Sequence, residues 1–193
     1  PWMFVLAMGF ILTPSYWLMA ALNTGAAFLK IGAGARPAAL GGAYTALADD
    51  VNAIYYNPGA LARLTKREMG ATHAEWLLGT KFDFIGYAQP TSLVTLGLGI
   101  TRLGVGTQDG RDANRQATGG FEASDTAYSF GLSRMLRQDA LFSGMTSVGV
   151  NLKRIESRIG AYSAGTWAWD LGALHQFAGS RMSLGFSVLN AGP

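Results

Sequence analysis

The chain has 193 residues, of which 14% are charged and 26 are glycine, whereas soluble domains carry about 25% charged residues. The net charge is only +3 and the basic residues are scattered, which argues against a nucleic-acid-binding stripe. The chain contains no cysteine, so disulfides, thiol catalysis and cysteine-ligated metal sites are excluded.

The first 22 residues form an apolar leader, and residues 2–22 carry no charge. A membrane-spanning helix needs about 20 apolar residues, so length alone leaves an anchor open. Pro14 interrupts the run, and Ala20-Ala21 offers a small-residue cleavage site. We therefore predict a signal peptide at 1–22, cut near Ala20 or Ala21. Because the chain starts with Pro1 and lacks a basic leader region, we expect it to begin inside a longer gene.

Residues 28–62 are rich in alanine and glycine and resemble neither the leader nor the rest of the chain. Pro37 suits the first turn of a helix, and Ala38–Leu47 predicts a small-residue helix that tolerates Gly41 and Gly42 at some loss of helix propensity. Small residues let backbones approach closely. We interpret residues 23–65 as a compact N-terminal plug or hatch that packs against something larger. We expect Gly41 and Gly42 to pack against that larger part, and Arg36 to contact Asp49-Asp50, because an unpaired buried charge is strongly penalised.

The second half of this segment carries a doubled acid, Asp49-Asp50, and then Asn57-Pro58. The two carboxylates are predicted to cap a short second helix, which Asn57-Pro58 then ends. A cation site is the alternative for the two acids, but it would need more oxygen ligands than the neighbouring sequence supplies.

A glycine-rich turn that binds a dinucleotide is a competing interpretation, because Gly32 and Gly34 follow an apolar stretch. The third glycine of that fingerprint would fall at Pro37. No alternation of strands and helices follows, as a dinucleotide-binding domain requires. We therefore expect no cofactor here.

The segment resembles the N-terminal signature of PorV/PorQ-type outer-membrane proteins, which are relatives of FadL-like channels. The matching stretches are Phe28–Arg36, Gly41–Asp50 and Asn57-Pro58, in the same order and spacing. The chain departs from that signature at Gly59-Ala60-Leu61, where the family usually has Ala-Gly-Leu. The dense part of the resemblance covers about a fifth of the chain, and we take Arg36, Gly41, Gly42, Asp49, Asp50, Asn57 and Pro58 as its structural signature.

From about residue 67 onward, apolar and small polar residues alternate with period two, which is typical of half-buried strands. In 93–103, for example, Leu96, Leu98 and Ile100 lie on one face and Gly97 and Gly99 on the other. The predicted strands cover 67–76, 81–89, 93–103, 125–134, 146–154, 165–176 and 182–190. Each has about 9–11 residues, the length that crosses an outer membrane at a tilt.

Alternation alone does not separate a membrane barrel from a soluble β-sandwich. Two features favour the barrel: the non-apolar faces carry glycine, serine and threonine with few charges, and short turns alternate with the long polar loop predicted at 104–123. The short link at 77–80 does not fit that rule. We therefore predict an all-β fold in which 66–193 form the first half of an antiparallel transmembrane β-barrel. The resemblance implies about 14 strands in all, of which about seven lie here.

The sequence offers little catalytic chemistry. His73 and His175 lie about a hundred residues apart, and His73 shares a strand face with Glu75 but has no nucleophile nearby. Trp76, Trp167 and Trp169 are predicted near strand ends, where aromatic residues gather at membrane interfaces; ordinary core packing is the alternative for them. We expect no catalytic, cofactor or metal residues and no enzyme activity.

The resemblance implies a non-enzymatic protein of the bacterial outer membrane that serves protein secretion or surface attachment. Its expected partners are outer-membrane lipid together with secretion-system proteins or a hydrophobic ligand, and no nucleic acid. Two alternatives stay open: a FadL-like channel that transports hydrophobic small molecules, and a soluble periplasmic β-sandwich that acts as a binding module.

Overall fold

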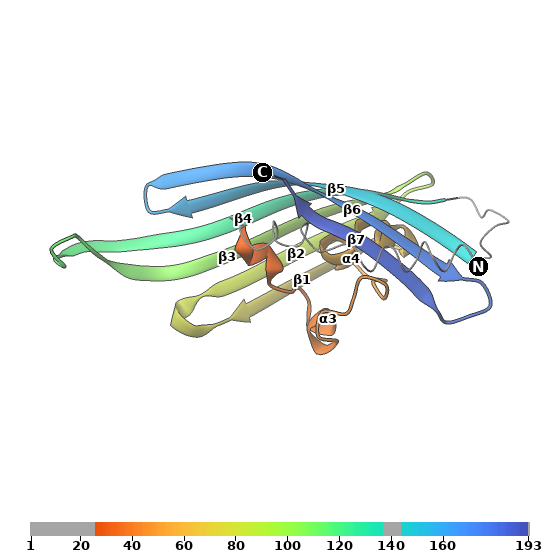
Figure 1. The fold of residues 1–193 in the computed structure, drawn as a ribbon, viewed down its shortest axis with the longest axis horizontal. Helices are drawn as coiled ribbons and strands as arrows, with labels where there is room; N and C mark the ends of the chain where they lie inside the picture. Colours follow the sequence, from red (N-terminus) through yellow and green to blue (C-terminus); the bar gives the residue numbers. More distant parts are fainter. Residues whose placement is uncertain (1–25, 137–143, 193) are drawn as a thin grey trace, which may run out of the picture.

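Seven consecutive strands form one antiparallel sheet in the order β1-β2-β3-β4-β5-β6-β7, so that each strand pairs with its neighbours in sequence (Figure 1). The computed structural model describes residues 26–136 and 144–192. The strands are β1 (Glu68–Glu75), β2 (Lys81–Pro90), β3 (Thr95–Arg111), β4 (Ala117–Met135), β5 (Gly144–Ile159), β6 (Tyr162–Phe177) and β7 (Ser183–Ala191). The predicted all-β, antiparallel architecture is confirmed. In the part described, the sheet is open, with β1 and β7 at its edges.

The four middle strands are longer than the sequence predicted. β3 to β6 have between 16 and 19 residues each. The long loop predicted at 104–123 is therefore wrong: β3 and β4 remain paired there, with register shifts near Val105 and Gly110, and only residues 112–116 form the turn. Hydrophobic alternation fades in this region because neither face is buried, while the backbone hydrogen bonds continue from the well-packed part of the sheet.

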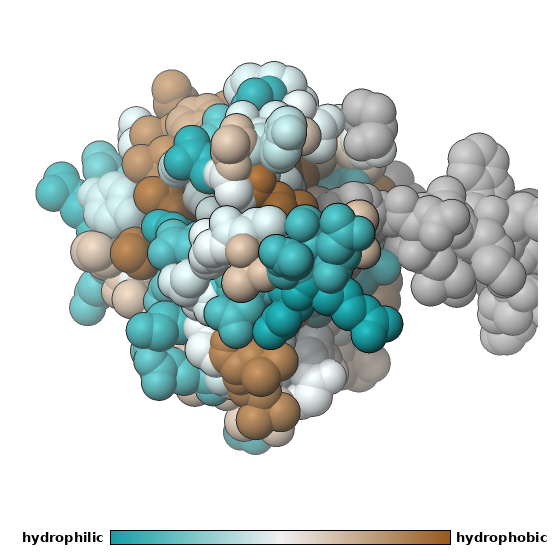
Figure 2. All heavy atoms as spheres, turned by 90° about the vertical axis from the view of Figure 1, so that its left-hand side faces the viewer, coloured by the Kyte–Doolittle hydropathy of each residue, from teal (hydrophilic) through white to brown (hydrophobic). Residues whose placement is uncertain are grey.

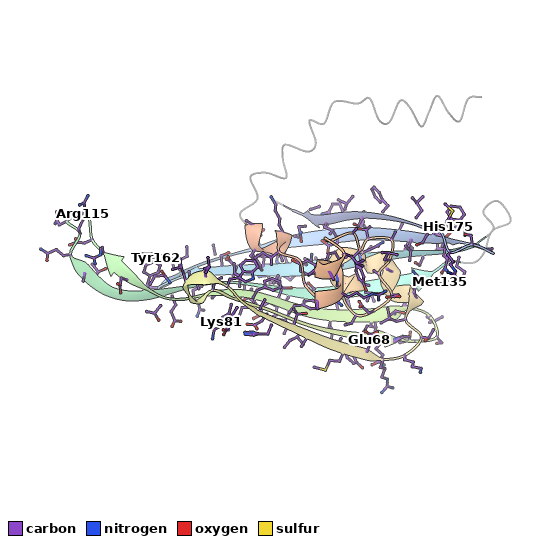
Figure 3. All side chains as sticks on the ribbon, turned by 90° about the horizontal axis from the view of Figure 1, so that it is seen from below. Glu68, Lys81, Arg115, Met135, Tyr162 and His175 are labelled. Atoms are coloured by element: carbon purple, nitrogen blue, oxygen red, sulfur yellow. The ribbon has the colours of Figure 1, made fainter. Side chains whose placement is uncertain are left out.

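The N-terminal segment, residues 26–64, lies against one face of the sheet, which we call the inner face; the opposite face is the outer face (Figure 3). The segment contains η2 (Ala27–Lys30), α3 (Ala35–Ala39), α4 (Ala53–Tyr56) and η3 (Pro58–Arg63). A short 3-10 helix, η4 (Leu77–Gly79), lies in the connection between β1 and β2. η3 contacts β3, β4, β5 and β6, which places it across the middle of the sheet.

The helix predicted at Ala38–Leu47 is wrong. α3 has five residues and ends before Gly41 and Gly42, whose φ angles of 62° and 80° are left-handed. Glycine adopts such angles without the steric penalty of a Cβ atom, and it ends helices for that reason.

The predicted capping of the second helix by the doubled acid is wrong: α4 begins after Asn52, and no side chain caps its first N–H groups. Asp50 instead closes the turn that precedes the helix. The backbone N–H of Asn52, at the start of α4, donates to the Asp50 carboxylate over 2.9 Å. Asp49 instead turns toward Arg36.

The main hydrophobic core lies between the N-terminal segment and the inner face. Its largest buried apolar side chains are Tyr44, Ile54, Leu61, Phe82, Phe84 and Leu174. The predicted signal peptide and its cleavage position lie outside the described residues. Within those residues, no helix is long and apolar enough to span a membrane.

Candidate functional site

The two faces of the sheet have opposite polarity, and the apolar one is exposed. Fifteen large apolar side chains on the outer face are each at least 38% exposed. We call them the apolar belt: Ile85, Leu98, Ile100, Tyr128, Phe130, Leu132, Val148, Val150, Leu152, Trp167, Trp169, Leu171, Leu184, Phe186 and Val188. The inner face buries the core side chains Phe82, Phe84 and Leu174 beneath the N-terminal segment, and its other buried residues include the polar Thr95, Thr101, Ser133, Ser147 and Asn151. A soluble half-buried sheet has the reverse arrangement.

Asn57 fastens the N-terminal segment to the inner face and is fully buried. Its side-chain amide donates to the carbonyl of Thr45 over 2.8 Å and to the carbonyl of Ala173 in β6 over 3.0 Å. Its side-chain oxygen accepts from the N–H of Gly59 over 3.0 Å. Asn57 therefore joins two turns of the segment to one strand of the sheet.

Glycines allow backbone-to-backbone contact at this point. A Cβ atom added to Gly172 in β6 would lie 2.1 Å from the side-chain oxygen of Asn57, and one added to Gly149 in β5 would lie 2.4 Å from the carbonyl oxygen of Pro58. Gly59 in turn approaches the carbonyl of Gly172 in the same way. The Asn57-Pro58-Gly59 turn fits only because these strand positions lack side chains.

Hydroxyl groups of the sheet complete the attachment. Ser133 of β4 donates to the carbonyl of Gly59 over 2.9 Å and accepts from the N–H of Ala62 over 3.2 Å. Ser183 of β7 donates to the carbonyl of Ala46 over 2.8 Å. Small polar residues on the inner face thus satisfy backbone groups of the segment that would otherwise be buried without partners.

A buried polar cluster lies beside this attachment, where β5, β6 and β7 meet. The Lys153 ammonium is 2.9 Å from the Asp170 carboxylate, and the two side chains are 3% and 0% exposed. Asp170 also accepts from the side chain of Asn151 over 2.8 Å and from the backbone N–H of Asn190 over 2.6 Å. Lys153 donates to the side chain of Asn190 over 2.7 Å and lies 5.8 Å from the centre of the Tyr55 ring.

Two tyrosines of α4 hold the beginning of the segment. The Tyr55 hydroxyl is within hydrogen-bonding distance of the carbonyls of Leu29 (2.8 Å) and Ile31 (2.5 Å), and Tyr56 donates to the carbonyl of Ala33 over 3.0 Å. Burial raises the pKa of Tyr55, so its hydroxyl stays protonated and remains a donor.

Arg36 and the doubled acid meet at the surface of the segment. Arg36 forms an ion pair with Asp49 and lies 3.9 Å from Asp50, and it also donates to the Tyr44 hydroxyl over 3.2 Å. The contact expected from the sequence is therefore present. It is not buried, since the Arg36 and Asp49 side chains are 53% and 44% exposed.

Gly41 and Gly42 do not pack against the sheet, although the sequence suggested that they would. A Cβ atom at either position would meet nothing within 4 Å. Their role is conformational, because both need left-handed φ angles. The glycines at the contact between sheet and N-terminal segment are instead Gly149, Gly172 and Gly185 of the strands. No local sequence pattern distinguishes them from the other strand glycines.

The histidines and tryptophans lie on or near the outer face. His73 lies 2.6 Å from Asp83 on β2 and 3.6 Å from Glu75, and His175 lies 2.8 Å from the Thr146 hydroxyl. Trp76 lies just beyond β1, but Trp167 and Trp169 lie within β6 because that strand extends further than predicted. All three tryptophans are about half exposed.

Sequence reasoning missed the Lys153–Asp170 pair. Both residues lie on the non-apolar faces of predicted strands, and this placement of opposite charges could have indicated an ion pair. Their meeting depends on the register that places Asn151 opposite Asp170 and on the bulge near Trp169 in the β6–β7 ladder. Across the described ranges, no group of three or more histidine or acidic side chains could hold a metal ion.

Comparison with known proteins places the chain in a family. Neither a curated protein nor a solved structure matches it. The model of an uncharacterised protein family, UPF0164, matches residues 21–161. The match includes the whole N-terminal segment and strands β1 to β5. It covers well over half of the 193 residues, and the chain therefore belongs to the uncharacterised protein family UPF0164.

Proposed function

We propose that this chain forms half of a bacterial outer-membrane β-barrel, plugged by its own N-terminal segment, that serves protein secretion or surface attachment without catalysing a reaction. The apolar belt is the observation that carries the proposal. An outward-facing apolar band and a polar interior are the defining polarity of membrane barrels. Exposed apolar patches on soluble monomers rarely exceed a few hundred Å², whereas the belt extends over six neighbouring strands, β2 to β7.

The two sheet edges support closure into a larger barrel. β1 and β7 each have one side without a neighbour among the described strands. Unpaired backbone amides in lipid are penalised by several kcal/mol each, so further strands must pair with both edges. Seven more would make the barrel of about 14 strands that the PorV/PorQ-type resemblance implies.

The long hairpins favour a role in holding a partner. A tilted strand crosses the membrane with about 9–11 residues, yet β3 and β4 have 17 and 19. The surplus extends past the belt as a β-ribbon that ends near Arg115, beyond the shorter β5–β6 hairpin near Tyr162 (Figure 3). Hydrophilic side chains cover much of this end of the molecule (Figure 2). A rigid polar ribbon suits the binding of a secreted protein.

The FadL-like channel has weaker support. Such a channel needs a continuous apolar path through the interior. The apolar side chains of the inner face, such as Phe82, Phe84 and Leu174, pack against the N-terminal segment instead, and the rest of the face carries mainly glycine, hydroxyl groups and the Lys153–Asp170 pair. A soluble sandwich would require a second sheet to cover the apolar belt, because the inner face already packs against the N-terminal segment.

Single-cysteine labelling tests the membrane placement, and the chain has no cysteine of its own. Leu98→Cys, Val150→Cys and Phe186→Cys would each carry an environment-sensitive dye in the full-length protein in vesicles. Lipids bearing a nitroxide should quench all three dyes but not a dye at Asn114→Cys in the hairpin turn. Equal quenching at Asn114 and at the belt positions would reject the barrel.

The partner role needs a separate experiment. Full-length protein isolated from its native membranes should retain a secretion-system or secreted protein. A variant whose β3–β4 ribbon is shortened to the length of the β5–β6 hairpin should lose that partner while still inserting into membranes. Retention of the same partner by the shortened variant would remove the ribbon from the proposal.

A further inference from the structure

A hollow of about 450 Å³ lies on the outer face between the apolar belt and the hairpin tips. β3 to β6 form its floor, and its lining contains Arg102, Arg154 and Arg158 but only one carboxylate, Glu156. The remaining polar groups are mostly serine and threonine hydroxyls. Arginine and hydroxyl donors around one hollow match the acceptor oxygens of a phosphate group.

The strand register brings the three arginines together. Arg154 on β5 lies opposite Tyr128 on β4 and Trp167 on β6. Arg102 on β3 lies opposite Thr126, one row nearer the tips, and Arg158 on β5 is two rows nearer. Rows are about 6.7 Å apart along a strand and neighbouring strands about 4.8 Å apart. The long arginine side chains can therefore reach one group in the hollow.

The hollow carries an excess of positive charge. Glu156 lies 3.6 Å from Arg154 and offsets part of that one charge. Within the described residues, no carboxylate pairs with Arg102 or Arg158. Two guanidinium groups are therefore available to an anion.

We propose that this hollow binds the phosphate group of an anionic lipid headgroup in the membrane leaflet nearest the hairpin tips. The inference rests on the proposed membrane placement. In that placement Tyr128 and Trp167 mark the aromatic boundary of the belt, and headgroups lie at that depth. Arg154 lies over the Trp167 ring, 5.4 Å from its centre, so one donor of the hollow lies at the boundary itself.

The belt explains why the phosphate should come from a lipid. Leu152 is two residues below Arg154 on the same face of β5, and it pairs with Phe130 on one side and Trp169 on the other. This apolar surface continues directly from the hollow and can contact an acyl chain. A free phosphate ion would gain nothing from that surface.

Gly165 provides a probe that changes no charge. A Cβ atom added there would lie 2.6 Å from a terminal nitrogen of Arg154. The arginine lies flat against the sheet because Gly165 has no side chain. Gly165→Ala should displace this flexible guanidinium group without disturbing the fold.

The test measures lipid retained by the full-length protein in native mass spectrometry, after reconstitution in vesicles of phosphatidylcholine and phosphatidylglycerol. We expect wild type to retain phosphatidylglycerol preferentially. Arg102→Gln with Arg158→Gln should reduce this preference about twenty-five-fold, since each arginine contributes about fivefold near a charged surface. Arg111→Gln with Arg115→Gln removes the same charge in the β3–β4 ribbon and should leave the preference within about twofold.

Two further variants sharpen the result. Glu156→Gln removes the one negative charge of the hollow and should strengthen retention, and Gly165→Ala should weaken it. Excess inorganic phosphate should not displace the lipid; displacement by free phosphate would overturn the lipid assignment. Equal retention by the Arg102/Arg158 and Arg111/Arg115 variants, with normal insertion shown by the cysteine labelling, would reject the site but not the barrel. Failure of wild type to insert would reject both.

Discussion

Single residues decide how tightly the N-terminal segment can approach the sheet. Gly172 has no space for a methyl group, because Asn57 and Gly59 occupy the position of its absent Cβ. Lys153 and Asp170 form an ion pair that is almost fully withdrawn from solvent. Both features lie at the attachment between segment and sheet, so substitutions there should act on the whole inner face.

Gly172→Ala should destabilise the full-length protein by about 1–3 kcal/mol, since the added methyl group would collide with backbone and a buried amide. Gly104→Ala is the matched control, because a Cβ atom at Gly104 meets nothing within 4 Å. Urea unfolding in vesicles measures both. Similar midpoints for the two variants would contradict the close contact at Gly172.

Lys153→Met should destabilise the protein by roughly 3–5 kcal/mol, because it leaves the Asp170 carboxylate buried without its cation. Adding Asp170→Asn to Lys153→Met should restore much of the loss. The uncharged amide has no need of a cation and can still accept from the N–H of Asn190. The same unfolding assay compares the two, and a double variant no more stable than Lys153→Met would show that the charge is not the cause.

At the scale of elements, the N-terminal segment and the β3–β4 ribbon differ from what local patterns suggested. The segment is mostly turns and very short helices, and interactions with the sheet hold it in place. The ribbon is a continuation of two strands whose hydrogen bonds persist after the apolar alternation ends. Both elements owe their structure to neighbours that are distant in sequence.

Asn57→Ala should loosen the segment, because it removes the donors to Thr45 and Ala173 and the acceptor for Gly59. We expect faster protease cleavage within residues 26–64 and a higher conductance of the reconstituted barrel. Arg36→Ala is the comparison, since exposed ion pairs contribute only about 0–1 kcal/mol, and it should change both readouts much less. Wild-type conductance and protease resistance in Asn57→Ala would mean that the segment does not close a pore.

For the whole molecule, the important property is the inversion of polarity between the two faces. The alternation of residues 93–103 predicts that Gly99→Arg should destabilise the protein less than Leu98→Arg if the lumen is wet, and the structure changes that expectation. Ile54 of the N-terminal segment would lie 3.5 Å from a Cβ atom at Gly99. Arginine at Gly99 would therefore disrupt the packing of the N-terminal segment against the sheet. Which face of the sheet contacts lipid has to be tested with a different pair of substitutions.

Leu98→Arg and Ile159→Arg make that comparison, because the two side chains are similarly exposed, at 50% and 60%. In a membrane, Leu98 lies within the belt and Ile159 at a hairpin tip. Arginine should then destabilise the protein by about 2–4 kcal/mol at Leu98 and by about 0–1 kcal/mol at Ile159. Folding equilibria in vesicles give both values. Equal losses at the two positions would show that the belt does not face lipid.

The sequence by itself determined the all-β class, the seven strands, the grouping of apolar residues on one face in strands that alternate cleanly, such as 93–103, and the separate character of residues 28–62, because period-two alternation and composition are local properties. It also indicated the contact of Arg36 with the doubled acid. Only the tertiary structure decided which glycines matter, that Lys153 meets Asp170, and that residues 104–111 and 117–123 lie in strands. Those features depend on strand register and on close approach between the N-terminal segment and β5 and β6, which lie about a hundred residues later in the chain. Contacts across such distances leave no periodic trace in the sequence.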